Sequence, residues 1–162
     1  MELEALTTQD ALALARQVAH APVQLIAVEY NWGPPVSGRF DVDFVQLWGA
    51  AHAHPGAKVV LHGERCDGSW SLDLPLIRLA AFSSGSGSAY ELHGLTLRAQ
   101  QEFRWEFVLR LESADGHVAY ADDQGRNYHI PPHQGRGLSA IRKGPVIYDL
   151  GRIVPCRLLH AE

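Results

Sequence analysis

The stretch "FRWEFVLRLESADGHVAY", residues 103–120, carries the clearest fold signal in the chain. From Phe103 to Glu112, large apolar residues alternate with mostly charged ones, which is the period of a strand with one buried face. The tripeptide "ADG" that ends at Gly116 is typical of a hairpin turn, and a second β-rich run follows it. The stretch therefore predicts an antiparallel hairpin with an apolar face turned toward a core.

Similar short runs, separated by turn residues, extend this pattern along the chain. We expect strands at 23–30, 39–48, 58–64, 72–82, 90–99, 117–123 and 126–130, with one or two more within 146–159. We expect a turn at 31–38 and a loop at 49–57. This succession of short strands without βαβ alternation predicts an all-β, antiparallel β-sandwich with a C-terminal strand extension.

The N-terminal residues predict a short helix instead. Thr7 or Thr8 can cap it, and Asp10 adds a negative charge to its first turn. Apolar residues then fall at helical spacing: Leu12, Ala15, Val18 and Ala19. We expect residues 1–21 to form a helix that packs on a sandwich domain at 22–162, the alternative being a helix that binds a partner.

Composition excludes several classes of protein. The chain has 162 residues, 46% of them hydrophobic and 20% charged, with a net charge of −4. These values are typical of one globular domain, and the lack of a basic patch argues against nucleic acid as a partner. No apolar run approaches the roughly 20 residues that span a bilayer, so we expect no membrane contact. The acidic N-terminus does not resemble a signal peptide, which predicts a cytoplasmic protein.

The residues that could form a metal or catalytic site do not have the sequence spacing that such sites require. His52 and His54 are two apart, and His62 and His93 could lie nearby, but no zinc-type ligand set is complete. The run from Asp122 to Gly125 has the acids of a calcium loop without the alternating ligands or the closing Glu. Cys66 and Cys156 form no metal-type pair, so we expect reduced, buried thiols. No nucleophile–base motif occurs, so we expect no enzyme, no metal and no cofactor.

Trp70 stands apart from the other tryptophans because it follows "CDGS" in a turn, among polar neighbours. An indole on a loop can offer a flat apolar face to a sugar ring while nearby polar groups satisfy its hydroxyls. The alternative is that Trp70 folds back over the end of the sandwich. The sequence leaves both interpretations open.

The order of motifs resembles a known family. "KVVLHGERCDGSW" (58–70) is followed by "YELHGLTL" (90–97) and then by "WEFVLRLESADGHVAYADDQGRNYHI" (105–130). This series is similar to the family 21 starch- and glycogen-binding modules, over about residues 23–130. The resemblance implies an immunoglobulin-like β-sandwich that binds an α-glucan without catalysis, in polysaccharide or oligosaccharide form.

The resemblance also implies a set of binding residues. They are Trp70, Tyr90, Tyr120, Asp122, Asp123, Gln124, Asn127 and Tyr128. Ala121 stands where the family has Trp or Tyr. If that position carried a stacking ring, its loss would cost about 1–1.5 kcal/mol, or roughly tenfold in affinity. The alternative function keeps the sandwich, loses the sugar site and docks a protein partner or a second copy, with 146–159 as an edge strand that pairs internally or with another chain.

Overall fold

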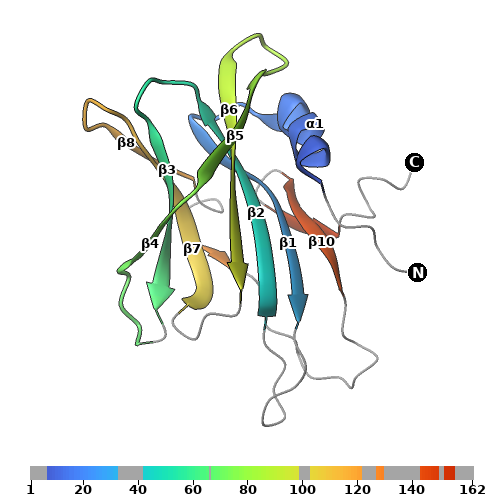
Figure 1. The fold of residues 1–162 in the computed structure, drawn as a ribbon, viewed down its shortest axis with the longest axis vertical. Helices are drawn as coiled ribbons and strands as arrows, with labels where there is room; N and C mark the ends of the chain where they lie inside the picture. Colours follow the sequence, from blue (N-terminus) through green and yellow to red (C-terminus); the bar gives the residue numbers. More distant parts are fainter. Residues whose placement is uncertain are drawn as a thin grey trace.

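The computed structural model describes residues 7–32, 42–65, 67–98, 103–121, 127–129, 143–149 and 152–155. These residues form two antiparallel sheets and one helix, as Figure 1 shows. The predicted all-β sandwich with an N-terminal helix and a C-terminal strand extension is confirmed. Its immunoglobulin-like character stays a prediction.

The elements follow one another in a simple order. They are α1 (Thr8–Val18), β1 (Val23–Trp32), β2 (Val42–His52), β3 (Lys58–Arg65), β4 (Leu72–Pro75), β5 (Ile77–Ser83), β6 (Ala89–Arg98), β7 (Phe103–Glu112), β8 (Val118–Ala121), β9 (Tyr128–His129), β10 (Lys143–Asp149) and β11 (Arg152–Pro155). The described part thus holds eleven strands.

The strands divide into a six-stranded and a five-stranded sheet. The first has the order β11-β10-β1-β2-β6-β5, and the second has the order β4-β3-β7-β8, with β9 also paired to β7. The C-terminal strand β10 pairs with β1, for example Ile147 with Ala27, and β11 pairs with β10. Of the two pairings considered for this extension, the internal one is therefore observed.

Two predicted boundaries were wrong, and inter-sheet packing explains the first. Strand β2 continues to His52, through the small residues from Gly49 that suggested a loop. A Cβ atom at Gly49 would lie 3.0 Å from the Cδ1 atom of Leu109, so the facing sheet leaves little room for a side chain there. Residues Asn31 and Trp32, expected in a turn, likewise belong to β1.

The run 72–82 is two strands in different sheets. Strand β4 pairs with β3, and β5 pairs with β6 across the sandwich. The change of sheet occurs at Leu76, which is buried and donates its backbone N–H to the carbonyl of Val59 at 2.9 Å. An apolar run of this length does not by itself show where a chain crosses from one layer to the other.

The core lies between the two sheets. The predicted alternation on β7 is confirmed from Glu106 to Glu112, because Phe107, Leu109 and Leu111 are buried and the residues between them are less so. The burial of Phe103 and Trp105 lies outside the described part of the chain. The three buried residues pack with residues of both sheets, including Leu25, Leu47 and Leu61. Truncating a fully buried Phe to Ala costs about 3–5 kcal/mol, so this face of β7 is a main source of stability.

Helix α1 covers the outer face of the six-stranded sheet. Thr7 is its N-cap, and Thr7 and Asp10 form a reciprocal capping box. The buried side of the helix, which includes Leu12 and Ala15, packs in a second cluster with Trp48 and Leu92 of the sheet. The helix therefore packs on this sheet of the sandwich. No described helix covers the outer face of the five-stranded sheet (Figure 1).

Candidate functional site

The outer face of the five-stranded sheet is defined by strand alternation. On β3, Leu61 points into the core and His62 points outward. Asp73 of β4 pairs with His62, so it lies on the same face. On the other side, Arg110 of β7 pairs with Tyr120 of β8, and both lie between inward-facing neighbours. The strands therefore place these four side chains on one surface.

The turn between β3 and β4 presents Trp70 at the edge of this surface. Gly68 has a φ of 87°, a conformation that side-chain-bearing residues rarely adopt. The backbone N–H of Gly68 donates to the carbonyl of Arg65 at 2.9 Å, and that of Arg65 donates to the carbonyl of Ser69 at 2.8 Å. Asp67 accepts the Ser69 backbone N–H at 2.8 Å and its hydroxyl at 2.6 Å. These bonds give the turn one defined shape immediately before Trp70.

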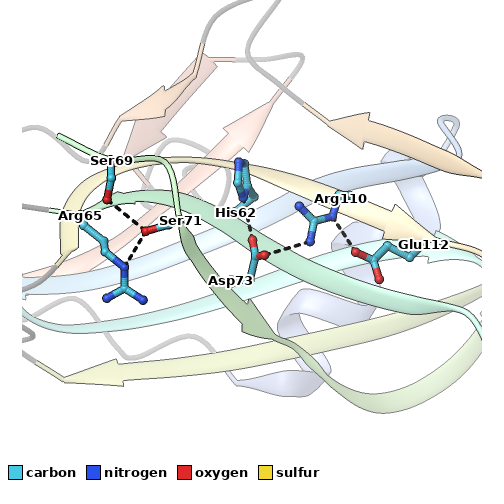
Figure 2. A network of polar contacts seen from close by, with 7 residues as sticks. All are labelled: His62, Arg65, Ser69, Ser71, Asp73, Arg110 and Glu112. Carbon is cyan, nitrogen blue, oxygen red and sulfur yellow. Dashed lines mark hydrogen bonds and ion pairs between the residues drawn. The ribbon is translucent and has the colours of Figure 1, made fainter.

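Side chains extend this order to Ser71, directly before β4. The Arg65 Nε–H donates to the Ser71 hydroxyl at 2.9 Å, and the Ser69 and Ser71 hydroxyls are 3.0 Å apart (Figure 2). The two hydrogen bonds from Ser69 hold the pKa of Asp67 below its ordinary value, so the carboxylate that organises the turn stays charged at neutral pH. Hydrogen bonds therefore hold the chain both before Trp70, at Ser69, and after it, at Ser71.

Trp70 does not fold back into the sandwich. Its residue remains 36% exposed, and its ring centroid lies 5.8 Å from that of His62, at an interplanar angle of 44°. The indole therefore packs against an outward-facing side chain and keeps part of its surface open to solvent. Of the two interpretations of the sequence, the structure favours the exposed ring.

A line of four charged or polar side chains runs beside Trp70 across three strands. We call His62, Asp73, Arg110 and Glu112 the polar row (Figure 2). The His62 Nδ1–H donates to Asp73 Oδ1 at 2.6 Å. Arg110 contacts Asp73 Oδ2 through Nη2 at 3.3 Å and Glu112 Oε1 through Nε at 2.8 Å. To reach β4 from β7, the Arg110 side chain must cross β3.

Hydrogen bonding within the polar row controls its charge. The bond from His62, followed by the contact with Arg110, holds the pKa of Asp73 below its ordinary value. The row consequently offers carboxylate acceptors and guanidinium donors in fixed positions at neutral pH. Fixed donors and acceptors beside an apolar ring are the usual components of a site for a polar ligand.

Tyr120 provides a second exposed ring on this face. It is 58% exposed on β8, directly beside Arg110 in the pairing of β7 with β8. Trp70 therefore lies against His62 of the polar row, and Tyr120 lies next to Arg110. Both residues belong to the predicted set, and the structure brings them to one surface.

Two other predicted residues lie elsewhere, so their assignment to the binding surface needs correction. Tyr90 is buried on the outer face of the six-stranded sheet, where it stacks on Phe82 and its hydroxyl donates to the Ala21 carbonyl at 3.0 Å. Tyr128 is buried in the core, 5.5 Å from the Phe107 ring centroid. A buried ring cannot stack on a ligand, and the resemblance of motifs gave no information about burial.

The rest of the predicted closing motif is described only in part. Asp122, Asp123 and Gln124 lie outside the described residues. Asn127 is exposed, and it precedes the pairing of β9 with β7.

The position of Ala121 shows that the loss of affinity expected from a missing stacking ring was wrong. Ala121 is buried, pairs with Leu109 and belongs to the core cluster. A larger ring at this inward position would enter the core, so its absence removes no platform from the surface. The outward residue of the same strand is Tyr120, because successive side chains of a strand point to opposite faces.

Sequence reasoning missed the polar row as a unit. His62 was considered only as a metal ligand, and Asp73 was not singled out. The alternating polar positions of β7 did signal an outward face for Arg110 and Glu112, but their cross-strand partners follow from register alone. Across the described residues, no group of three or more His, Cys, Asp or Glu residues could hold a metal ion.

Comparisons of the chain with protein-family models, with curated proteins and with solved structures each gave no match. The family resemblance therefore stays a hypothesis based on its motifs. In the part of the chain that the structure describes, no helix has the length and apolar character needed to cross a membrane.

Proposed function

We propose that the outer face of the five-stranded sheet binds carbohydrate without catalysis, and that an α-glucan is its ligand. The observation that carries this proposal is the exposed Trp70 ring, held by an ordered turn beside the polar row. Sugars present apolar C–H faces and polar hydroxyl edges together. A partly exposed indole next to paired donors and acceptors fits both parts of such a ligand.

The polar row supports a binding role because its members are already paired with one another. Asp73 holds both His62 and Arg110, and Arg110 also holds Glu112. Side chains fixed in this way lose little conformational entropy when they form hydrogen bonds with hydroxyl groups, which favours binding by a shallow surface. The choice of an α-glucan among sugars rests on the motif resemblance.

Affinity electrophoresis in gels that contain glycogen tests the proposal. The wild-type protein should be retarded, and Trp70→Ala should lose most of the retardation because it loses the stacking ring. A stacking ring contributes about 1 kcal/mol, which corresponds to a weakening of affinity of roughly fivefold to tenfold. Trp70→Phe should keep part of the binding.

Val118→Ala is the matched control, because Val118 is an apolar residue that is 50% exposed on the same sheet but carries no ring. It should migrate like the wild type in every gel. Wild-type migration that glycogen and soluble starch leave unchanged would refute the proposal. Equal retardation of the wild type and Trp70→Ala would move the binding site elsewhere.

The second candidate function is docking of a protein partner, and one observation favours it. Ile77 and Leu79 are exposed apolar residues on β5, which is an edge strand of the six-stranded sheet. Edge strands with exposed apolar residues are common sites of strand pairing between chains. Sedimentation equilibrium separates this function from sugar binding: a dimer that Ile77→Lys dissociates would support it, and a monomer at all concentrations would exclude self-pairing.

A further inference from the structure

The spacing of the two exposed rings defines the size of ligand that this face can hold. Trp70 packs against His62 on β3, whereas Tyr120 lies on β8, with β7 between the two strands. Two inter-strand steps measure about 10 Å. Tyr120 is also displaced along the strands, because its partner Arg110 is two residues from Val108, which pairs with His62.

Two residues along a strand add about 7 Å, so the diagonal from the His62 backbone to the Tyr120 backbone is about 12 Å. A single pyranose ring is too small to cover both aromatic side chains over that separation. A chain of linked sugars can lie along the diagonal and contact each ring with a different unit.

The surface between the rings suits such a chain. The Arg110 side chain crosses β3 along this diagonal to reach Asp73. Its Nε atom also forms an ion pair with Glu112. Val60 and Val108 occupy the remaining outward positions of β3 and β7 in these rows. A chain that runs from Trp70 to Tyr120 would therefore meet charged donors and acceptors at its hydroxyl edges and apolar groups beneath it.

We infer that this face selects an extended oligosaccharide over a single sugar or disaccharide, with Tyr120 as a second stacking platform that sets the preference for length. The inference rests on the proposed carbohydrate-binding function. It assigns a separate role to each ring: Trp70 contributes to the binding of short and long ligands, whereas Tyr120 contributes only when the ligand is long enough to reach β8.

Titration calorimetry with maltose and maltoheptaose on the full chain tests this division. The wild type should bind maltoheptaose more tightly than maltose. Tyr120→Ala should weaken maltoheptaose binding by roughly fivefold to tenfold and leave maltose binding within twofold, because the lost ring contributes about 1 kcal/mol of stacking. Trp70→Ala should weaken the binding of both maltose and maltoheptaose. Tyr120→Phe should keep the wild-type affinity for maltoheptaose.

Val118→Ala is the matched control, since Val118 is 50% exposed on the same strand and face but carries no ring. It should leave both affinities unchanged, and all variants should keep the wild-type melting temperature within a few degrees. If Tyr120→Ala binds maltoheptaose as tightly as the wild type while Trp70→Ala does not, the inference is overturned and the proposed function stands. If the wild type binds neither ligand, both are overturned.

Discussion

We expect His93 to make the stability of this protein depend on pH. It lies on β6 and is only 6% exposed. It pairs with Gly49, whose missing side chain would point at Leu109 in the core, so the imidazole faces the interior of the sandwich. Its Nδ1 atom has no hydrogen-bond partner in the described part of the chain. A buried imidazole in this environment resists protonation.

Burial, assisted by the positive charge of Arg78, lowers the pKa of His93 from 6.5 to about 4. Arg78 is the cross-strand neighbour of His93 and forms an ion pair with Glu91, which shares this face of β6. Because the folded state has the lower pKa, the unfolded chain binds a proton first. The loss of folding stability caused by His93 is therefore absent above pH 6.5, grows as the pH falls toward 4, and is complete below pH 4.

The magnitude follows from the two pKa values. Each pKa unit is worth about 1.4 kcal/mol, so the fall from 6.5 to about 4 corresponds to about 3 kcal/mol, of which about 2 kcal/mol is lost by pH 5. Replacing the imidazole by an apolar side chain of similar size removes this dependence. Between pH 7 and pH 5, the free energy of unfolding of His93→Leu should therefore rise by about 2 kcal/mol relative to that of the wild type.

Urea denaturation at pH 7, 6, 5 and 4, followed by tryptophan fluorescence, measures this difference. Carboxylates also titrate toward the lower end of this range, but they contribute equally to both proteins and cancel in the comparison. His54→Leu, at an exposed histidine, is the control and should keep the wild-type slope. Parallel curves for the wild type and His93→Leu would refute the assignment of a buried neutral imidazole.

Three further predictions concern local features of the fold. Gly68→Ala should cost about 1–2 kcal/mol in urea denaturation, because a φ of 87° is unfavourable for alanine although space is open around it; an unchanged midpoint would show that the turn adapts. Thr7→Ala should lose about 1 kcal/mol by removing the capping box of α1, and a smaller far-UV helix signal on heating would accompany it. Asp73→Asn should cost at most about 1 kcal/mol at neutral pH and less in 1 M salt, because the pair is partly exposed. Since the folded pKa of Asp73 lies below its unfolded value, its contribution is present above pH 3.8 and disappears as the pH falls through the folded pKa, which a pH series on wild type and variant would show.

Local patterns were sufficient to predict much of the fold. The alternation of β7, the Gly116 turn and the Thr7 cap all depend on neighbouring residues, and all are confirmed. The errors arose where distant residues decide the outcome. The local sequence around Gly49 predicts a loop, but in the sandwich Gly49 lies in β2 and leaves space for Leu109.

The binding surface shows the same division. Trp70 could be singled out because its turn and polar neighbours are local features. Tyr90 and Tyr128 could not be told from surface aromatics, because their burial depends on α1, Phe82 and Phe107. The inward position of Ala121 depends on its pairing with β7.

The sequence by itself determined the all-β class, the helix at the start of the chain and the ordered turn that carries Trp70. Only the tertiary structure decided that Trp70, Tyr120 and the polar row share one face. The physical reason is that strand periodicity gives each residue one of two faces, whereas register between strands decides which residues from distant segments meet there. His62 and Asp73, separated by a turn, and Arg110, far along the chain, become one unit only when β3, β4 and β7 are paired.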